Sequence, residues 1–589
     1  MPSRPVTPGS PVAGGPTTGG NANLDINSWQ VWWQLNHPRF VGIAGNASEA
    51  DRRDKAMPAL QATLADHKNP DVLSATLIAM GKATVAHPTI DPVAAIREHL
   101  PDGNADVREA AILALGLSGR PEAVDDLTAL LHDERPGRKL VERSSVDERA
   151  RTFAACGLGL LAQRTESPEL ATKALSALIR ALEDKGLRER DVLTGVLNGM
   201  RLVGDSGVKG TRFKRLRWQA LDALITFQKR RMSSKLAVAQ SHAMTAMAML
   251  ARGGSQADRE RVVEVALDVL TRRRDAETES YVSAVIALGE LLRPTDTEAL
   301  EVLVKHVKRP KDSLIPKFAM IAFGQIGGQV AFEQLRDGFV RGKRDLQPWA
   351  ALGLGLHVHE TKARPAPAPV GTTSIKRDWS DEVESMLGAA IKSENRDEMR
   401  AAIALGLGLS GTTSAAETLR KMALETKSEL HKGHLVVALS MLEDKPAIMV
   451  AEEGMETVRD AVYFGHCALA LAEYGRRGNS SWPLARLQNL PLSFNYVTWL
   501  AASAQALGHL KNAADLPQLI ATLQARKDRN RRRTAAGLDN FRSAFAAAAI
   551  GSVVDRDPLG FGARIAHGMN YTVREQTISN GKNGILDIF

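Results

Sequence analysis

Apolar residues between positions 107 and 131 recur with the period of an α-helix, in two runs separated by a short break. The first run has an apolar stripe at Val107, Ala111, Ala114 and Leu115. The second run has a stripe at Val124, Leu127, Leu130 and Leu131. Spacings of three or four residues place side chains on one face of a helix, so the pattern predicts two amphipathic helices.

The break between the runs has the residues of a helical hairpin. Gly116 and Gly119 come where the first helix is expected to end, because glycine tolerates the left-handed conformation of a helix C-terminus. Pro121 suits the first turn of the second helix, where its missing N–H costs no hydrogen bond. A lone hairpin cannot bury both stripes, whereas a stack of similar hairpins can.

The same unit recurs along almost the whole chain of 589 residues. A glycine after an alanine-rich apolar run marks each clear copy: Gly81, Gly116, Gly159, Gly289, Gly324, Gly355, Gly406, Gly475, Gly508 and Gly551. Weaker copies are expected in the longer gaps, at 195–204, 243–253 and 435–442. Gly81 and Gly116 are 35 residues apart, as are Gly289 and Gly324, which is a period typical of solenoid repeats.

Two copies carry the motif of a known family. Asp102–Gly116 reads D-x-x-x-D-V-R-E-A-A-I-L-A-L-G, and Asn395–Gly406 reads N-R-D-E-M-R-A-A-I-A-L-G. This motif resembles the HEAT repeats, including the short HEAT-like repeats of phycobilisome lyases, over roughly residues 50–555. The resemblance implies an all-α, right-handed α-solenoid of about a dozen or more helical hairpins. In the family's usual geometry the A-L-G helix lies on the outer wall and the following helix lines the concave face.

The N-terminal region differs from the repeats. Residues 1–24 are rich in Pro, Gly, Ser and Thr and predict a disordered tail, because such a segment cannot bury a core. Residues 25–50 contain a predicted helix with Trp29, Trp32 and Trp33 on one face. This helix is interpreted either as a cap over the end of the first repeat or as an aromatic docking site for a partner or glycan.

The motif W-x-x-W-W-x-x-N ahead of the repeats also resembles a group of uncharacterised HEAT-repeat proteins from planctomycete-type bacteria. Those proteins are usually exported, so the resemblance implies an exported or periplasmic protein whose leader has been removed. The chain as given carries no charged and apolar leader and by itself predicts a cytoplasmic protein. Both compartments stay open.

Two further stretches depart from the repeat pattern. Residues 361–380 contain alternating Pro and Ala, which favours an extended insert between an N-terminal array at 51–360 and a C-terminal array at 381–555. Residues 556–589 form a glycine-rich tail that ends in the apolar stretch Ile585–Phe589. This end is expected either to fold back onto the last repeat or to dock into another molecule.

The chain is basic, with 76 Lys and Arg against 67 Asp and Glu and a net charge of +9. Basic clusters occur at Lys209–Arg217, Lys229–Arg231, Arg272–Arg274 and Arg526–Arg533. Acidic neighbours favour solvated loops and helix ends over a nucleic-acid surface for most of them. The densest run, with Arg529, Arg531, Arg532 and Arg533, is read as a loop or as an anion-binding patch.

No residue pattern predicts a catalytic, metal or cofactor site. His357-Val358-His359-Glu360 has histidines two apart, which do not face one site on a helix, and no third ligand is evident near His431 and His434. These last two are expected on the surface. His466 and Cys467 are adjacent and point to different sides of a helix, so they predict no dyad. Cys156 and Cys467 are expected to be buried free thiols.

The sequence therefore predicts a non-enzymatic protein-interaction or assembly scaffold that binds protein partners along its concave face. The alternative is a binder of nucleic acid or another anionic polymer, and the least favoured reading is a HEAT-like enzyme such as a bilin lyase. No small-molecule site is evident. No run of 18 apolar residues occurs, so no membrane span is expected. The fold by itself does not assign an activity.

Overall fold

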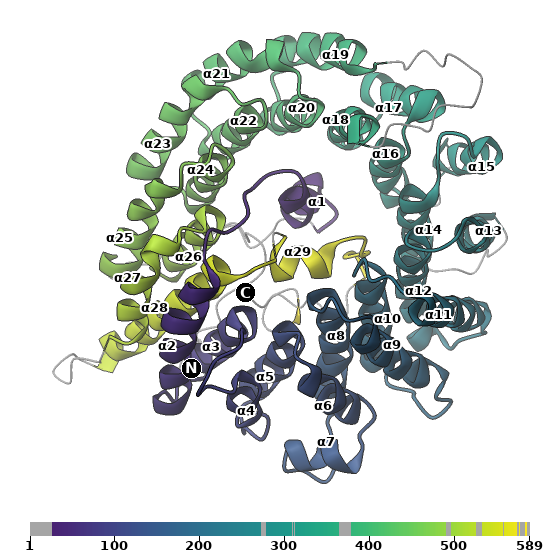
Figure 1. Cartoon of the computed structure of the whole chain (residues 1–589). Helices are drawn as coiled ribbons and strands as arrows, with labels where there is room; N and C mark the ends of the chain where they lie inside the picture. The colour runs from purple at the N-terminus through teal and green to yellow at the C-terminus, as the bar shows by residue number, and fades with distance from the viewer. Residues whose placement is uncertain are drawn as a thin grey trace, which may run out of the picture.

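The computed structural model describes residues 26–271, 278–308, 310, 312–363, 378–490, 496–525, 533–557, 559–573, 577 and 584–585. Within these residues the chain is all-α, with no strand. Helices alternate along the chain between an inner and an outer layer, and the two layers curve into a ring (Figure 1). The predicted all-α solenoid of paired helices is confirmed.

Thirteen helices of the described residues form the inner layer: α3 (Pro70–Ala83), α5 (Ala105–Ser118), α8 (Glu148–Arg164), α10 (Arg190–Gly204), α12 (Ser234–Arg252), α14 (Thr278–Leu291), α16 (Leu314–Ile326), α18 (Gln347–Ala363), α20 (Asp397–Ser410), α22 (Glu429–Met441), α24 (Ala461–Glu473), α26 (Tyr496–Leu510) and α28 (Arg533–Val554). Thirteen form the outer layer: α2 (Met57–Asp66), α4 (Pro92–Arg97), α6 (Pro121–Leu131), α9 (Pro168–Glu183), α11 (Thr211–Lys229), α13 (Gln256–Thr271), α15 (Thr297–Lys308), α17 (Gly328–Arg341), α19 (Ser380–Ser393), α21 (Ala416–Glu425), α23 (Ile448–Thr457), α25 (Ser481–Asn489) and α27 (Leu516–Leu523).

The remaining helices lie outside this alternation. They are α1 (Trp29–Asn36), α7 (Arg135–Leu140), α29 (Gly560–Ala566), the 3-10 turn η1 (His37–Arg39) and the π-helical turn η2 (Asp51–Ala56). Short 3-10 turns precede α21, α23, α25 and α27, at Thr413–Ala415, Lys445–Ala447, Arg477–Ser480 and Ala513–Asp515. Every helix within the described ranges is too short or too polar to cross a lipid bilayer.

The hairpin predicted around residues 105–131 forms as α5 and α6. The side chain of Asn104 caps α5 by accepting hydrogen bonds from the backbone N–H groups of Asp106 and Val107. Gly119 ends the helix in the left-handed region, with φ of 63°, and Pro121 begins α6. The weaker copies predicted near 195–204, 243–253 and 435–442 are likewise present, as α10, α12 and α22.

The expectation that Gly116 ends its helix is wrong, because this glycine lies inside α5. Its role is to let two inner helices approach closely. A Cβ atom at Gly116 would lie 2.4 Å from the carbonyl oxygen of Gly157 on α8. Gly355 has the same relation to Gly406, at 2.2 Å from its carbonyl oxygen. The recurring glycines therefore mark contacts between helices, except Gly475, which follows α24 with φ of 70° and would bring its Cβ within 4 Å of no other atom.

The two layers are arranged opposite to the expectation from the family resemblance. The A-L-G helices form the inner wall, and the helices that follow them form the outer wall (Figure 1). Helices on the inner wall share a shorter circumference, so they must lie closer together than those outside. Alanine and glycine permit this close approach because their side chains add little width, which explains why these residues collect in one helix of each pair.

The ring closes where the last inner helix, α28, packs against the first, α3. Gly551 on α28 faces Ala79 on α3, and a Cβ atom added to Gly551 would lie 2.9 Å from the Cα of Ala79. This is the same small-residue contact that joins consecutive inner helices. The inner layer is also continuous from α18 to α20, on either side of the proline-rich stretch, of which 364–377 lie outside the described residues.

Candidate functional site

The concave face of the ring is the surface on which the sequence predicts partner binding. In the structure this face is covered by the two ends of the described chain. Helix α1 with η1 lies inside the ring from the N-terminal side, and α29 lies inside it from the C-terminal side (Figure 1). The two segments contact each other and the inner helices. The expected open groove is therefore filled by the protein itself.

The three tryptophans of α1 are buried inside the ring. Trp29, Trp32 and Trp33 are 1%, 5% and 1% exposed. The indole N–H of Trp29 donates a hydrogen bond of 3.1 Å to Oε1 of Glu398 on α20, and its ring lies 5.5 Å from that of His434 on α22. Helix α1 does not lie over the end of the first repeat, where the capping interpretation put it. That end is covered by α28, which packs against α3.

The chain after α1 continues across the rim of the ring and ties the N-terminal segment to the last repeats. The backbone N–H of Gly42 donates to Oε2 of Glu473 at 2.6 Å. A guanidinium N–H of Arg477 donates to the carbonyl oxygen of Ala44 at 2.7 Å. The side chain of Asn46 accepts a 2.8 Å hydrogen bond from the backbone N–H of Ala513. These contacts hold the segment at the point where the ring closes.

Four histidines meet between η1 and the inner wall: His37, His434 on α22, His466 on α24 and His509 on α26. The rings of His434 and His466 are 4.7 Å apart, and those of His37 and His509 are 5.9 Å apart. Burial lowers the pKa of His37 and of His434 to about 4, that of His509 to about 3, and that of His466 well below its ordinary value. All four are neutral at pH 7 and pack as aromatic rings.

The C-terminal segment is held inside the ring by polar contacts to α10 and α14. Arg201 on α10 is fully buried and donates to the carbonyl oxygens of Ile565 and His567. The side-chain amide of Asn570 donates to Oγ of Ser283 on α14 at 2.9 Å. Ile585 is fully buried in the core, so the described part of the apolar C-terminus packs inside the protein. Residues 586–589 lie outside the described residues.

A buried ionic cluster joins α28 to three other parts of the ring. Nη1 of Arg164, at the end of α8, lies 2.6 Å from Oδ1 of Asp555, and their side chains are 5% and 3% exposed. Lys82 on α3 and Lys511 after α26 lie close enough to act on the same carboxylate. Burial alone would raise the pKa of Asp555, but the charges of Arg164 and Lys82 hold it below its ordinary value.

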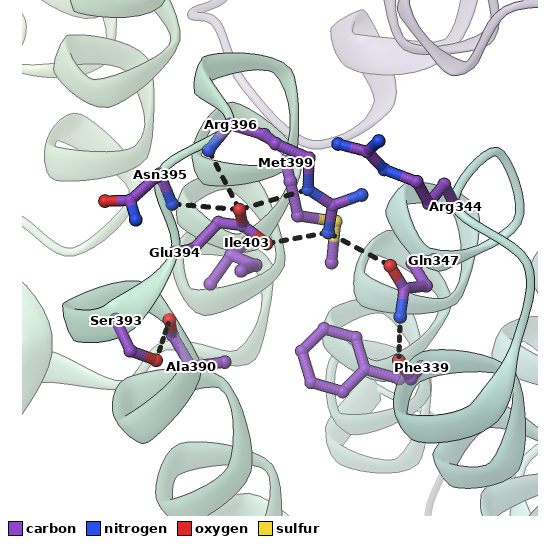
Figure 2. A pocket seen from close by; sticks show the side chains of 10 residues that line it. All are labelled: Phe339, Arg344, Gln347, Ala390, Ser393, Glu394, Asn395, Arg396, Met399 and Ile403. Carbon is purple, nitrogen blue, oxygen red and sulfur yellow. Dashed lines mark hydrogen bonds and ion pairs between the residues drawn. The ribbon is translucent and has the colours of Figure 1, made fainter.

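A cavity of about 370 Å³ opens between two neighbouring repeats, at the connections that lead into α18 and α20 (Figure 2). Its polar side is fixed: Arg396 pairs with Glu394 at 2.7 Å and donates to Gln347 at 3.0 Å. The hydrogen bonds from Arg396 lower the pKa of Glu394 to about 2. The guanidinium of Arg344 reaches into the opening, opposite the apolar side chain of Phe339 (Figure 2).

The remaining residues named from the sequence have different surroundings in the structure. Arg529, Arg531 and Arg532 lie outside the described residues, as does the side chain of Arg533, whose backbone begins α28. His357 packs against Trp379 with ring centres 5.3 Å apart, and burial lowers its pKa to about 4. The prediction that His434 lies on the surface is wrong, because α1 covers its inner helix.

The two cysteines are free and buried, as predicted. Burial raises the pKa of each thiol to about 12, so both are protonated at neutral pH. Among the described residues no three His, Cys, Asp or Glu side chains are grouped as a metal site would require. Sequence reasoning missed Arg201, although an arginine among the apolar residues near the end of α10 is a signal that the sequence contains.

Known proteins resemble this chain in its helical repeats. Residues 57–146 match the family of HEAT repeats. No curated protein sequence matches the chain. Among solved structures, importin beta is similar with a TM-score of 0.40 and 12% identity, over 81% of this chain and 59% of that one, so this chain spans less than two thirds of importin beta.

The complex of CpcE and CpcF of phycocyanin lyase from Nostoc sp. PCC7120 is similar with a TM-score of 0.29 and 20% identity, over 51% of this chain and 95% of that one. An engineered protein is similar with a TM-score of 0.29 and 16% identity, over 71% of this chain and 98% of that one.

Proposed function

Because this chain is a HEAT-repeat protein, we propose that it is a non-enzymatic scaffold whose partner proteins bind the outer wall and the rims of the ring. The observation that carries the proposal is the placement of the large apolar side chains that remain exposed. Among the described residues, four of the five large apolar side chains that are exposed lie on outer helices: Trp218, Val340, Leu424 and Met449, at 50%, 60%, 61% and 75%. The fifth, Leu430, is 39% exposed and lies at the start of the inner helix α22. We take these side chains as contact points for another protein, because the fully buried core of a protein interface is richer in apolar area than the surrounding surface.

The filled interior of the ring supports the same assignment of surfaces. A partner that entered the ring would have to displace α1 or the C-terminal segment. Displacement of the C-terminal segment would leave the buried Arg201 without the carbonyl oxygens of Ile565 and His567, which costs several kcal/mol. Binding inside the ring through Trp29, Trp32 and Trp33 stays a prediction that requires this displacement. Binding of an anionic polymer through Arg529, Arg531, Arg532 and Arg533 also stays a prediction.

The state of the two thiols supports the non-enzymatic part of the proposal. Cys156 and Cys467 are protonated at neutral pH, so neither is a ready nucleophile. His466 beside Cys467 is buried among aromatic rings, and its pKa lies well below the range useful for a general base near pH 7. The chemistry of this pair therefore favours packing.

The test is cross-linking mass spectrometry on the tagged full chain in its source cells. A partner protein should cross-link to lysines of the outer wall, such as Lys421, and the variants Leu424→Asp and Met449→Asp should weaken at least one partner while leaving the melting temperature within a few degrees. Trp33→Phe, which keeps an aromatic ring in the core, serves as the comparison for binding inside the ring. A partner set that is unchanged by both outer variants and altered by Trp33→Phe, with the melting temperature kept, would place binding inside the ring and overturn the proposal.

A further inference from the structure

We propose that the outer-wall surface formed by Lys209, Arg212, Lys214, Arg215 and Trp218 binds an acidic segment of a partner protein. This inference rests on the scaffold function proposed above and names the chemistry of one partner. We call these five residues the α11 patch. All five side chains are exposed, and Trp218 is 50% exposed. Four of the residues lie at the beginning of α11, and Lys209 lies two residues before it.

The indole of Trp218 is held in place from the next outer helix. The guanidinium of Arg261 on α13 lies over the ring, 5.3 Å from its centre. Nη2 of Arg261 also pairs with Oδ1 of Asp222, one helical turn beyond Trp218, at 2.9 Å. A tryptophan fixed in this way loses little conformational entropy on binding, and Trp and Arg are the residues that most often dominate the binding energy of protein interfaces.

The cations of the patch are unpaired. The side chains of Lys209, Arg212, Lys214 and Arg215 form no hydrogen bond or ion pair with any residue that the structure describes. Lys214 and Arg215 lie four and three residues before Trp218, so both are its neighbours on the helix surface. The one carboxylate on this face of α11, that of Asp222, is already engaged by Arg261.

Three other cations of the outer wall differ from those of the patch because carboxylates neutralise them. Arg97 pairs with Asp126 at 2.6 Å, Arg180 pairs with Glu134 at 2.8 Å, and Arg420 pairs with Asp444 at 2.6 Å. The patch therefore presents a local excess of positive charge beside an exposed apolar ring. A surface of this kind is complementary to carboxylates that flank an apolar side chain.

The base of the patch is rigid. Arg217 turns inward on the opposite side of α11, where its guanidinium lies 5.1 Å from the centre of the Phe213 ring and donates to the carbonyl oxygens of Gly253 and Val208. Phe213 is fully buried. These contacts fix the start of α11 against the inner layer, so the exposed side chains project from a firm support.

The dimensions of the patch favour a protein segment over nucleic acid. Arg212 and Trp218 are about 9 Å apart along the axis, at 1.5 Å per residue, which matches about three residues of extended peptide. A single exposed indole gives no row of stacking platforms for successive bases.

The experiment measures binding of a fluorescein-labelled twelve-residue peptide, with Glu and Asp flanking a central Phe-Leu pair, by fluorescence anisotropy with the full chain. We expect micromolar to millimolar binding that weakens as NaCl rises from 50 to 300 mM. Trp218→Ala and the double variant Lys214→Glu with Arg215→Glu should each weaken binding at least tenfold. Arg341→Glu changes an arginine that is 82% exposed on another outer helix and should leave binding unchanged.

Three outcomes would overturn the inference: equal binding of the peptide with Gln and Asn in place of its acids, equal loss in Arg341→Glu, or tighter binding of a single-stranded oligonucleotide through the same residues. Circular dichroism of each variant checks that the fold is intact. Failure here is distinguishable from failure of the scaffold function, because partners that cross-link near Leu424 or Met449 do not depend on the α11 patch.

Discussion

The ion pair between Arg164 and Asp555 is expected to hold the ring closed, and the substitution Asp555→Asn tests this. The change keeps the shape of the side chain and removes its charge. Arg164 then loses a carboxylate 2.6 Å away in a site where its own side chain is 5% exposed. Breaking a buried ion pair from one side costs about 3–5 kcal/mol, because the remaining charge stays buried without compensation.

The structure gives reasons to expect the upper part of that range. Lys82 and Lys511, which are 6% and 9% exposed, also interact with the carboxylate of Asp555. Its removal leaves three cations in one buried cluster. The neighbouring carboxylate of Asp557 compensates only in part, because Arg564 already pairs with it at 3.0 Å.

The assay combines urea denaturation, followed by circular dichroism at pH 7, with small-angle X-ray scattering of the native protein. Asp555→Asn should lower the free energy of unfolding by the stated amount and increase the maximum dimension as α28 separates from α3. Glu425→Gln is the control, because its pair with Lys421 is 3.9 Å long and exposed, and such pairs contribute about 0–1 kcal/mol.

Replacement of both partners separates charge burial from packing. Arg164→Met with Asp555→Leu should be less destabilising than Asp555→Asn alone, because no unpaired charge remains between those two positions. A loss below about 0.5 kcal/mol in Asp555→Asn, within the range of ordinary surface changes, together with unchanged scattering, would refute the view that this pair closes the ring.

Three further predictions follow from the packing. Gly116→Val should lower the free energy of unfolding by about 1–3 kcal/mol or more, because its Cβ would meet a carbonyl oxygen of α8 at 2.4 Å. Gly388→Ala, with no atom within 4 Å of its Cβ, should raise it by about 0.5–1 kcal/mol. Thermal melts compare the two variants. Trp33→Ala should cost about 3–5 kcal/mol and speed proteolytic cleavage before residue 50, and an unchanged cleavage rate would contradict the buried position of α1. The folded pKa values of His434 and His509 lie below their ordinary 6.5, so their stabilising effect is complete above pH 6.5 and is lost as pH falls. At pH 5 each histidine should lower the free energy of unfolding by about 2 kcal/mol. Urea titration measures this loss, and His434→Gln should reduce it.

Much of the candidate site was out of reach of sequence reasoning, although its residues could be named. The tryptophans of α1 were identified as a special cluster from their spacing alone, and their shared helical face is real. Their neighbours Glu398 and His434 lie more than 350 residues further along the chain. No local pattern connects positions so far apart, so the sequence left a cap and a docking site as two readings of one feature.

What the sequence determined by itself is the repeating helix pair, including the faint copies that became α10, α12 and α22. That information is local, because helix periodicity, the cap at Asn104 and the turn at Gly119 depend on residues within a few turns of one another. The tertiary structure alone decided which helix faces inward, that Gly551 meets Ala79, and that α1 and α29 lie inside the ring. Each repeat adds a small rotation to the one before it, and only the sum of all these rotations brings α28 back to α3.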